Sequence, residues 1–323
     1  MTDKPLPRTL IEAVEFFADE TTCNQMLLEI KWPGGKVVCP KCGNESCHEL
    51  STRPGQLKCN KAECQKQFSL KKDTIFEKSP LSLSLWFVAV WHIANCRNGI
   101  SSYEVSRALG VTQPTAWFML HRIREAMRCD SFSGGPKLAG EVESDETFVG
   151  GKAKNMHAKK REQLTGRGGV DKAAVQAIVE RGGNAMTFVP DRLDRENLRG
   201  NILRSVSRDS ALYTDSSSPS NGLGWAFDHQ TVNHSIGEYV RGRVSTNLVE
   251  CFFALLKRAL KGTYIAVAPY HLARYAAEQG FRFNVRGLSG AARFLRLLQG
   301  VVGKRLTYRR LCAVGDSGFM GLK

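Results

Sequence analysis

The stretch EVESDETFV (141–149) decides the fold class of this chain. Its side chains alternate as a strand requires, with successive residues on opposite faces. Two more strands are predicted over 175–179 and 185–189, and a helix over 195–205 precedes a short strand over 211–214. Strands followed by helices predict an α/β domain in the second half of the chain.

Three acidic residues of this domain form a candidate metal site. Asp145 lies in the first strand, Asp215 follows the strand over 211–214, and Glu250 lies near the start of a helix predicted over 248–260, at intervals of 70 and 35 residues. Carboxylates that gather repel one another unless a cation lies between them, and Mg²⁺ is the natural cation. Two ions about 3.5–4 Å apart would activate a water or a 3′-hydroxyl and stabilise the leaving oxygen of a phosphodiester.

Each of the three carboxylates also has an ordinary explanation. Asp145 could be a solvent-facing strand residue, since Glu143 and Glu146 show that carboxylates are common here. Asp215 precedes three serines and a proline, so its side chain could start a turn. Glu250 follows Asn247 by three residues, which is the spacing of a capping box at a helix start. Taken alone, the spacing leaves these alternatives open.

The charge of the chain predicts a nucleic-acid partner. The 323 residues include 46 Lys and Arg against 31 Asp and Glu, a net charge of +15. Segment 151–172 has seven basic and two acidic residues and segment 253–310 has twelve and one, whereas 1–150 has 18 of each. Such a field attracts a polyanion, and DNA or RNA is the leading candidate. A soluble protein that is merely basic is the alternative.

No targeting or membrane-spanning segment is predicted. The longest apolar stretch, 85–94, is far shorter than the roughly 18 residues that cross a bilayer, and the N-terminus has no signal-peptide core. With 42% hydrophobic and 24% charged residues, the composition excludes a fibrous or fully disordered chain. From the chain length we expect two domains and a small appended module. Because no targeting or membrane-spanning segment is predicted, we expect the protein in the cytoplasm.

The cysteine spacing predicts a structural zinc site. Four cysteines fall into two pairs, the first with two intervening residues and the second with four: Cys39 and Cys42, then Cys59 and Cys64. Disulfides are not expected, because the cytosol keeps thiols reduced. Four thiolates can close a tetrahedral Zn²⁺ site and stabilise a zinc ribbon too small to fold by apolar burial alone. Because the second pair is wider than usual, Cys47 and His48 are substitute ligands, and free thiols are the alternative.

Residues 81–127 are predicted to be helical, with apolar residues every three or four positions. A helix over 102–109 ends at Gly110, and the next helix starts with Thr112 as N-cap and Pro114 in its first turn. A short helix, a glycine-containing turn and a longer helix form a helix-turn-helix. On the second helix, these side chains are predicted to reach a DNA major groove: Gln113, Thr115, His121, Arg122 and Arg124. A helical hairpin used only for packing is the alternative.

Five runs of sequence match one family in the same order: CPKC (39–42), GISSYEVSRALGVTQPTAWFMLHRIREAM (99–127), ESDETFVGGK (143–152), HQTVNHSIGEYVRG (229–242) and STNLVECFFALLKRALKGTY (245–264). Over residues 30–290 the chain resembles the zinc-ribbon DDE transposases of bacterial insertion sequences. The resemblance implies an RNase H-like catalytic domain in which Asp145, Asp215 and Glu250 hold two Mg²⁺ ions, with Mn²⁺ as a substitute.

The resemblance also implies roles for two further residues. Lys257 matches the family's basic residue after the glutamate, and its spacing of seven from Glu250 puts it on the same helix face, where it could touch a phosphate. His234 lies in the matching HQTVNHS run and is a candidate for positioning DNA or a water, or else a histidine hydrogen-bonded near a strand. The chain has Ser-Thr-Asn at 245–247 where many relatives have His-Thr-Asn or His-Val-Asn, and Asn247 is the fallback third metal ligand.

The function implied is that of a transposase, which binds the terminal inverted repeats of its own element, cuts the transferred strand and joins the freed 3′-hydroxyl to target DNA. Further phosphate contacts are expected from basic residues: Lys159, Lys160, Arg161, Arg258 and Lys261. The family implies a homo-oligomer on double-stranded DNA, and no organic cofactor is expected. The rivals are a DNA-binding regulator with an inactive second domain and a nuclease that does not join strands.

The predicted fold class is an α/β RNase H-like catalytic domain preceded by a small zinc ribbon and a helical helix-turn-helix domain. The expected parts are an N-terminal helical segment (1–35), the zinc ribbon (36–72), the helix-turn-helix domain (80–128), a Gly- and Ser-rich linker (129–140), the catalytic domain (141–290) and a basic C-terminal tail (291–323). The sequence has no internal repeat.

Overall fold

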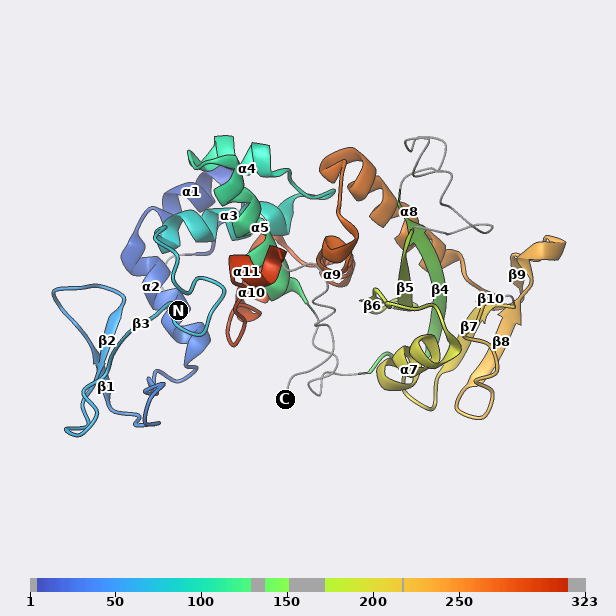
Figure 1. Cartoon of the computed structure of the whole chain (residues 1–323), viewed down its shortest axis with the longest axis horizontal. Helices are drawn as coiled ribbons and strands as arrows, with labels where there is room; N and C mark the ends of the chain where they lie inside the picture. The colour runs from blue at the N-terminus through green and yellow to red at the C-terminus, as the bar shows by residue number, and fades with distance from the viewer. Residues whose placement is uncertain (1–4, 129–136, 151–171, 217, 313–323) are drawn as a thin grey trace. The chain divides into compact units, whose positions relative to one another are not determined.

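The structure, a computed structural model, describes residues 5–128, 137–150, 172–216 and 218–312. These residues form two compact units, which Figure 1 shows in the colours of the chain: the first joins the N-terminal residues up to 127 with residues 287–312, and the second is built from residues 128–286. Within the described ranges, none of the helices has both the length and the apolar character needed to cross a bilayer.

The first unit is mainly helical. Its elements are α1 (Leu10–Phe17), α2 (Glu20–Lys31), β1 (Cys47–Glu49), β2 (Gln56–Cys59), β3 (Gln67–Ser69), α3 (Leu83–Asn95), α4 (Ser102–Leu109), α5 (Gln113–Met127), α10 (Gly290–Gln299) and α11 (Tyr308–Cys312). The turn between α4 and α5 is built as the sequence predicts. Gly110 ends α4 with φ of 66°, a left-handed conformation that glycine adopts without strain, and the Thr112 hydroxyl accepts the Thr115 N–H at 3.4 Å.

Aromatic side chains from three helices form the core of the first unit. Phe294 of α10 packs against Phe17 of α1 at a centroid distance of 4.9 Å and against Phe87 of α3 at 5.8 Å. All three side chains are fully buried. The structure therefore corrects the expectation of a C-terminal tail: residues 291–312 belong to the first unit, because the apolar face of α10 completes its core. The rest of the expected tail, 313–323, lies outside the described residues.

The second unit is an α/β domain. Its elements are β4 (Glu141–Val149), β5 (Ala173–Glu180), β6 (Ala185–Phe188), α7 (Arg195–Ser205), β7 (Ala211–Asp215), β8 (Asp228–Val232), the short helix η3 (His234–Ile236), β9 (Val240–Arg241), β10 (Val244–Ser245), α8 (Asn247–Ala259), η4 (Leu260–Tyr264), η5 (Pro269–His271) and α9 (Leu272–Asn284). The four predicted strands and both predicted helices are confirmed within a few residues. The remaining strands were not predicted, because their short, polar sequences lack an apolar alternation.

A five-stranded sheet with the order β6-β5-β4-β7-β8 forms the centre of this unit (Figure 1). β5 runs antiparallel to β4 and to β6, whereas β7 runs parallel to β4 and β8 runs parallel to β7. Because β4, β7 and β8 point the same way, their C-terminal ends meet at one edge of the sheet. This edge carries the candidate site.

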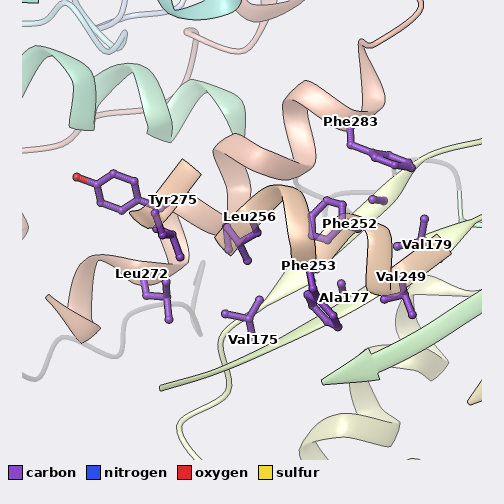
Figure 2. Packing of buried hydrophobic residues seen from close by; sticks show 13 residues of the cluster. Val175, Ala177, Val179, Val249, Phe252, Phe253, Leu256, Leu272, Tyr275 and Phe283 are labelled. Carbon is purple, nitrogen blue, oxygen red and sulfur yellow. The ribbon is translucent and has the colours of Figure 1, made fainter. Parts of the chain in front are cut away.

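Helices cover both faces of the sheet. Figure 2 shows the face covered by α8 and α9, where apolar residues of the helices pack on β5: Val175, Ala177, Val179, Val249, Phe252, Phe253, Leu256, Leu272, Tyr275 and Phe283. The other face packs against α7 through a second cluster that includes Val142, Ile178, Ile202 and Leu212. The side chains of β4 alternate between these two environments, so alternate residues of EVESDETFV face α8.

The expected linker over 129–140 is only partly a linker. Leu138 forms a parallel bridge with Val206 and is 2% exposed in the core against α7. Residues 137–140 therefore lead directly into β4, and 129–136 lie outside the described residues.

Candidate active site and zinc centre

The register of the sheet brings Asp145 and Asp215 side by side. β4 and β7 pair in parallel with Glu143 opposite Tyr213, and continuing this register by two residues puts Asp145 opposite Asp215. Adjacent strands lie about 4.8 Å apart, so the two carboxylates are neighbours although 70 residues separate them. Asp145 also pairs with Ala177, which belongs to the core under α8, and this places Asp145 on the face that α8 covers.

Glu250 reaches this face because β4 holds the start of α8. One oxygen of Glu143 accepts the backbone N–H of Leu248 at 2.8 Å and that of Val249 at 3.1 Å, two donors that have no partner within the helix. The N-cap residue Thr246 makes no side-chain cap. Its hydroxyl instead donates to Glu250 at 3.3 Å. The capping box considered for Asn247 and Glu250 is therefore replaced by a cap from the neighbouring strand.

His234 lies between the acidic residues. Its Nδ1 is 3.5 Å from Asp215 Oδ2 and 3.8 Å from Glu250 Oε1, and its Nε2 is 3.2 Å from the Thr246 hydroxyl. Because that hydroxyl gives its proton to Glu250, it accepts from Nε2–H of the imidazole. The structure thus brings together four of the five predicted catalytic side chains: Asp145, Asp215, Glu250 and His234.

Burial and neighbouring carboxylates both act on the ionisation of Asp145. Burial raises the pKa of Asp145 to about 7, and the negative charges of Glu146, Asp215 and Glu250 act in the same direction. Burial also raises the pKa of Glu146, against the hydrogen bonds it accepts from the hydroxyls of Ser220 and Ser218. A concentration of negative charge that resists ionisation is what a bound cation relieves.

The protein without divalent cation at this site is expected to lose stability as the pH rises. Folding raises the pKa of Asp145 from 3.8 to about 7, so between these values the folded state keeps a proton that the unfolded state has released. The free energy of unfolding therefore falls with increasing pH, by up to about 4 kcal/mol over the whole window. Urea denaturation of zinc-loaded protein in magnesium-free buffer at pH 5 and pH 8 measures this. Asp145→Asn should show a much smaller difference in the free energy of unfolding between the two pH values. An equal difference in the variant and the parent would contradict the assignment.

The residues present suit a divalent cation. Carboxylate oxygens are the ligands that Mg²⁺ and Mn²⁺ prefer, and Asp145, Asp215 and Glu250 supply them from two strand ends and one helix start. Glu250 is exposed and Asp145 and Asp215 are half-buried, so the site is open on one side. The three side chains are more widely spread than a preformed single-ion cage, since their oxygens are not all within 4.8 Å of one another in the described part of the chain.

Basic side chains continue the exposed face of α8 away from Glu250. Lys257 is half-buried, whereas Arg258 and, one turn further, Lys261 are exposed. Arg258 and Lys261 are therefore accessible on the surface of the second unit. The other predicted phosphate contacts, Lys159, Lys160 and Arg161, lie outside the described residues.

The predicted DNA-contacting face of α5 is wrong for three of its five residues. Arg122 is 4% exposed, its Nη2 donates to the Glu77 carbonyl at 2.6 Å, and its guanidinium lies 5.2 Å from the ring of Trp86. His121 and Arg124 are 0% and 1% exposed. The C-terminal half of α5 is buried on all sides, so its polar residues belong to the interior. The other two, Gln113 and Thr115, are partly exposed at the start of the helix.

Arg122→Ala is expected to lower the stability of the first unit by about 2–4 kcal/mol, because it removes a buried hydrogen bond and leaves a cavity beside Trp86. Thermal unfolding followed by circular dichroism measures this. The matched control is Arg258→Ala on exposed α8, which should change stability by no more than about 0.5 kcal/mol. Equal stability of both variants would show that Arg122 does not hold the core.

Four cysteines of the first unit converge on one point. The sulfurs of Cys39 and Cys64 are 3.8 Å apart, those of Cys42 and Cys59 are 3.7 Å apart, and all four lie within 4.8 Å of one another. A tetrahedral site with Zn–S bonds of about 2.3 Å has edges of about 3.8 Å, so the cluster fits structural zinc. The wide spacing of the second pair is accommodated by a turn in which Cys64 and the following residue donate to the Lys61 carbonyl.

Cys47 and His48, considered as substitute ligands, are not part of the cluster. The Cys47 thiol lies 3.7 Å from the Asn44 carbonyl, and the His48 ring contacts the side chain of Asn60. Both residues belong to β1, which pairs with β2 beside the cluster. They support the ribbon without joining the four thiolates.

One cavity of the second unit lies away from the acidic site. It has a volume of about 490 Å³ and is lined by the N-terminal ends of β4, β7 and β8, including Glu141, Tyr213 and Asp228. Asp145 and Asp215 lie toward the opposite ends of their strands. The cavity is therefore separate from the candidate active site.

Two known domain families match the parts of the chain that hold the cysteine cluster and the acidic residues. Residues 18–67, which include the four clustered cysteines, match a transposase zinc-ribbon domain, and residues 137–284, which include the three carboxylates, match an ISXO2-like transposase domain. A Cys₄ ribbon followed by an α/β domain with this acidic edge defines the class of zinc-ribbon DDE transposases.

The chain belongs to this family, the transposases of insertion sequences. It is similar to a protein of Halobacterium salinarum described as an uncharacterized protein in transposable element ISH50. The two are 27% identical over 257 residues, which is 76% of this chain and 85% of the relative.

Proposed function

We propose that this transposase binds the terminal inverted repeats of its element, cuts one strand with the help of divalent cations, and joins the freed 3′-hydroxyl to target DNA. The observation that carries the proposal is the convergence of Asp145, Asp215 and Glu250 at one sheet edge. The strand order, three antiparallel strands followed by two parallel ones, supports an RNase H-like fold for this unit.

In this proposal the three carboxylates hold Mg²⁺, or Mn²⁺ as a substitute. When bound, the cations would activate the attacking water or 3′-hydroxyl and stabilise the leaving oxygen. His234 orients Asp215 and Glu250, which it faces at 3.5 and 3.8 Å. Because Glu143 caps α8, Glu250 is free to be the third ligand and the fallback Asn247 is not needed. Lys257, on the same helix face as Glu250 two turns later, holds a phosphate of the transposon end.

Residues of both units bind DNA. On the second unit, Arg258 and Lys261 continue the phosphate path, together with Lys159, Lys160 and Arg161. On the first unit, the start of α5 presents Gln113 and Thr115, and these residues and the zinc ribbon recognise the repeat. Two ends must be held together for transposition, so the active form is an oligomer on DNA. The protein acts in the cytoplasm and needs no organic cofactor.

End-labelled duplexes that carry the terminal repeat, incubated with Mg²⁺ or Mn²⁺ and a supercoiled target plasmid, test the proposal. A transposase yields nicked ends and products in which the labelled strand is joined to the plasmid. A DNA-binding regulator shifts the duplex in a gel without cutting it. A nuclease cuts the duplex but gives no joined product. Either of the last two results would overturn the proposed reaction.

A further inference from the structure

We propose that Glu143 and Arg181 are positioning residues that hold Glu250 at the active site by fixing the first turn of α8. The inference rests on the proposed function of Asp145, Asp215 and Glu250. Neither residue touches those three carboxylates through a described contact. Both instead act on the backbone that carries Glu250.

Glu143 divides its two oxygens between two tasks. Oε2 accepts the N–H groups of Leu248 and Val249, the second and third residues of α8. Oε1 accepts from Arg181, at 2.8 Å from Nε and 2.7 Å from Nη2. The side chain of Glu143 is 1% exposed, so water cannot replace these partners. A single buried carboxylate therefore ties the start of α8 to β4, two residues before Asp145.

Arg181 connects this carboxylate to the segment that enters α8. Its Nη1 donates to Glu141 Oε2 at 3.2 Å and to the Arg243 carbonyl at 2.7 Å, and its Nη2 donates to the Ser245 hydroxyl at 2.7 Å. Its guanidinium also lies 4.8 Å from the ring of Tyr213 on β7. The planar guanidinium of Arg181 thus holds β4, β7 and the chain just before α8 in fixed positions relative to one another.

This arrangement frees the natural cap of α8 for the active site. The hydroxyl of Thr246, at the N-cap position, makes no cap hydrogen bond and instead joins His234 to Glu250. If Glu143 released the helix, Thr246 would be drawn back to the free N–H groups, as N-cap residues are. The link between His234 and Glu250 would then be lost.

Charge supports the same assignment. Glu143 lies on the same face of β4 as Asp145 and two residues away, so its negative charge would add to an already acidic edge. Arg181 neutralises it at 2.7 Å and also pairs with Glu141 at 3.2 Å. The charge of Glu143 is therefore balanced by Arg181 and does not add to the acidic edge.

The opening of the first turn of α8 would be local. The helix is anchored further along by Phe252, Phe253 and Leu256, which are buried against β5 (Figure 2). Loss of the clamp is therefore expected to move Glu250 without unfolding the domain.

Full-length zinc-loaded Arg181→Gln and Glu143→Gln test the clamp, with Arg195→Gln on the exposed start of α7 as the matched control. Hydrogen–deuterium exchange is read on peptides that contain Leu248 and Val249 and on peptides of β5. Binding of Mn²⁺ is titrated by the loss of the free-ion EPR signal, and strand cleavage is measured at saturating Mn²⁺. Asp145→Asn is included to test the metal site itself.

We expect faster exchange at 248–249 in both clamp variants, unchanged exchange in β5, and a roughly 10- to 100-fold weaker affinity for Mn²⁺. Arg195→Gln should behave like the parent. Glu143→Gln keeps the shape of the side chain, so it provides the test if Arg181→Gln does not fold. Unchanged exchange at 248–249 would overturn the clamp. Faster exchange with parental Mn²⁺ affinity and cleavage would also overturn it, because Glu143 would then be only a helix cap.

The proposed function fails in a different way. If Asp145→Asn binds Mn²⁺ and cuts DNA like the parent, the metal site is wrong, whatever the exchange at 248–249 shows. If Asp145→Asn loses Mn²⁺ binding and DNA cleavage while the clamp variants keep both, the metal site is supported and the clamp proposal is wrong.

Discussion

Asp145→Asn is expected to lower the rate of strand cleavage at least about a thousandfold, because a cation at the site supplies several kcal/mol of transition-state stabilisation and an amide holds it poorly. The substitution keeps the size of the side chain and removes a carboxylate whose pKa burial already raises to about 7. The packing of the neighbouring strands should not change. Binding of the transposon end, which depends on the basic residues, should change by no more than about twofold.

The matched control for this prediction is Asp209→Asn, which removes an exposed carboxylate in the loop before β7. It should cut and join DNA like the parent. Quantitative cleavage of labelled ends and gel-shift titration of the same duplex measure the two properties separately. Parental cleavage by Asp145→Asn would show that the acidic edge does not catalyse the reaction.

Cys59→Ser is expected to remove zinc from the first unit and unfold the ribbon. Binding of structural zinc contributes about 10–16 kcal/mol of folding free energy in small zinc modules. The three short strands of the ribbon bury only a few other apolar side chains, such as Leu57 and Phe68. Cys59 lies in β2, at the centre of the three-stranded sheet, and its sulfur is 3.7 Å from that of Cys42. Zinc content by atomic absorption should fall from one ion per chain to none, and binding of the transposon end should weaken.

Cys47→Ser provides the control, because Cys47 pairs directly with Cys59 across the sheet but lies outside the thiolate cluster. It should keep its zinc and its DNA affinity. Loss of zinc in Cys47→Ser but not in Cys59→Ser would mean that the ligand set is wrong.

The sequence predicts the second unit well, because local patterns coincide there with the tertiary fold. EVESDETFV alternates between two buried faces, and the predicted helices over 195–205 and 248–260 each bury one face. Residue type and placement offer Asp145, Asp215 and Glu250 as a candidate metal site, but only the resemblance favours it over the ordinary explanation of each carboxylate. Their meeting depends on the parallel register of β4 and β7, which no local pattern contains.

The residues that the sequence does not reveal are those whose partners are distant. Arg122 has the spacing of an exposed helix residue, yet the Glu77 carbonyl and Trp86 bury it. Phe294 lies in a basic segment that resembles a tail, but its partners Phe17 and Phe87 are some 200 residues or more earlier in the chain. Glu143 could be suspected from one signal only, its place two residues before Asp145 on the same face of a strand.

The central claim is that Asp145, Asp215 and Glu250 share divalent cations. Crystals of the full chain grown with MnCl₂, with diffraction recorded on both sides of the manganese absorption edge, test it most directly. We predict anomalous peaks within about 2–2.5 Å of oxygens from all three side chains. No peak at this edge of the sheet, or a peak elsewhere while the three carboxylates point apart, would contradict the account.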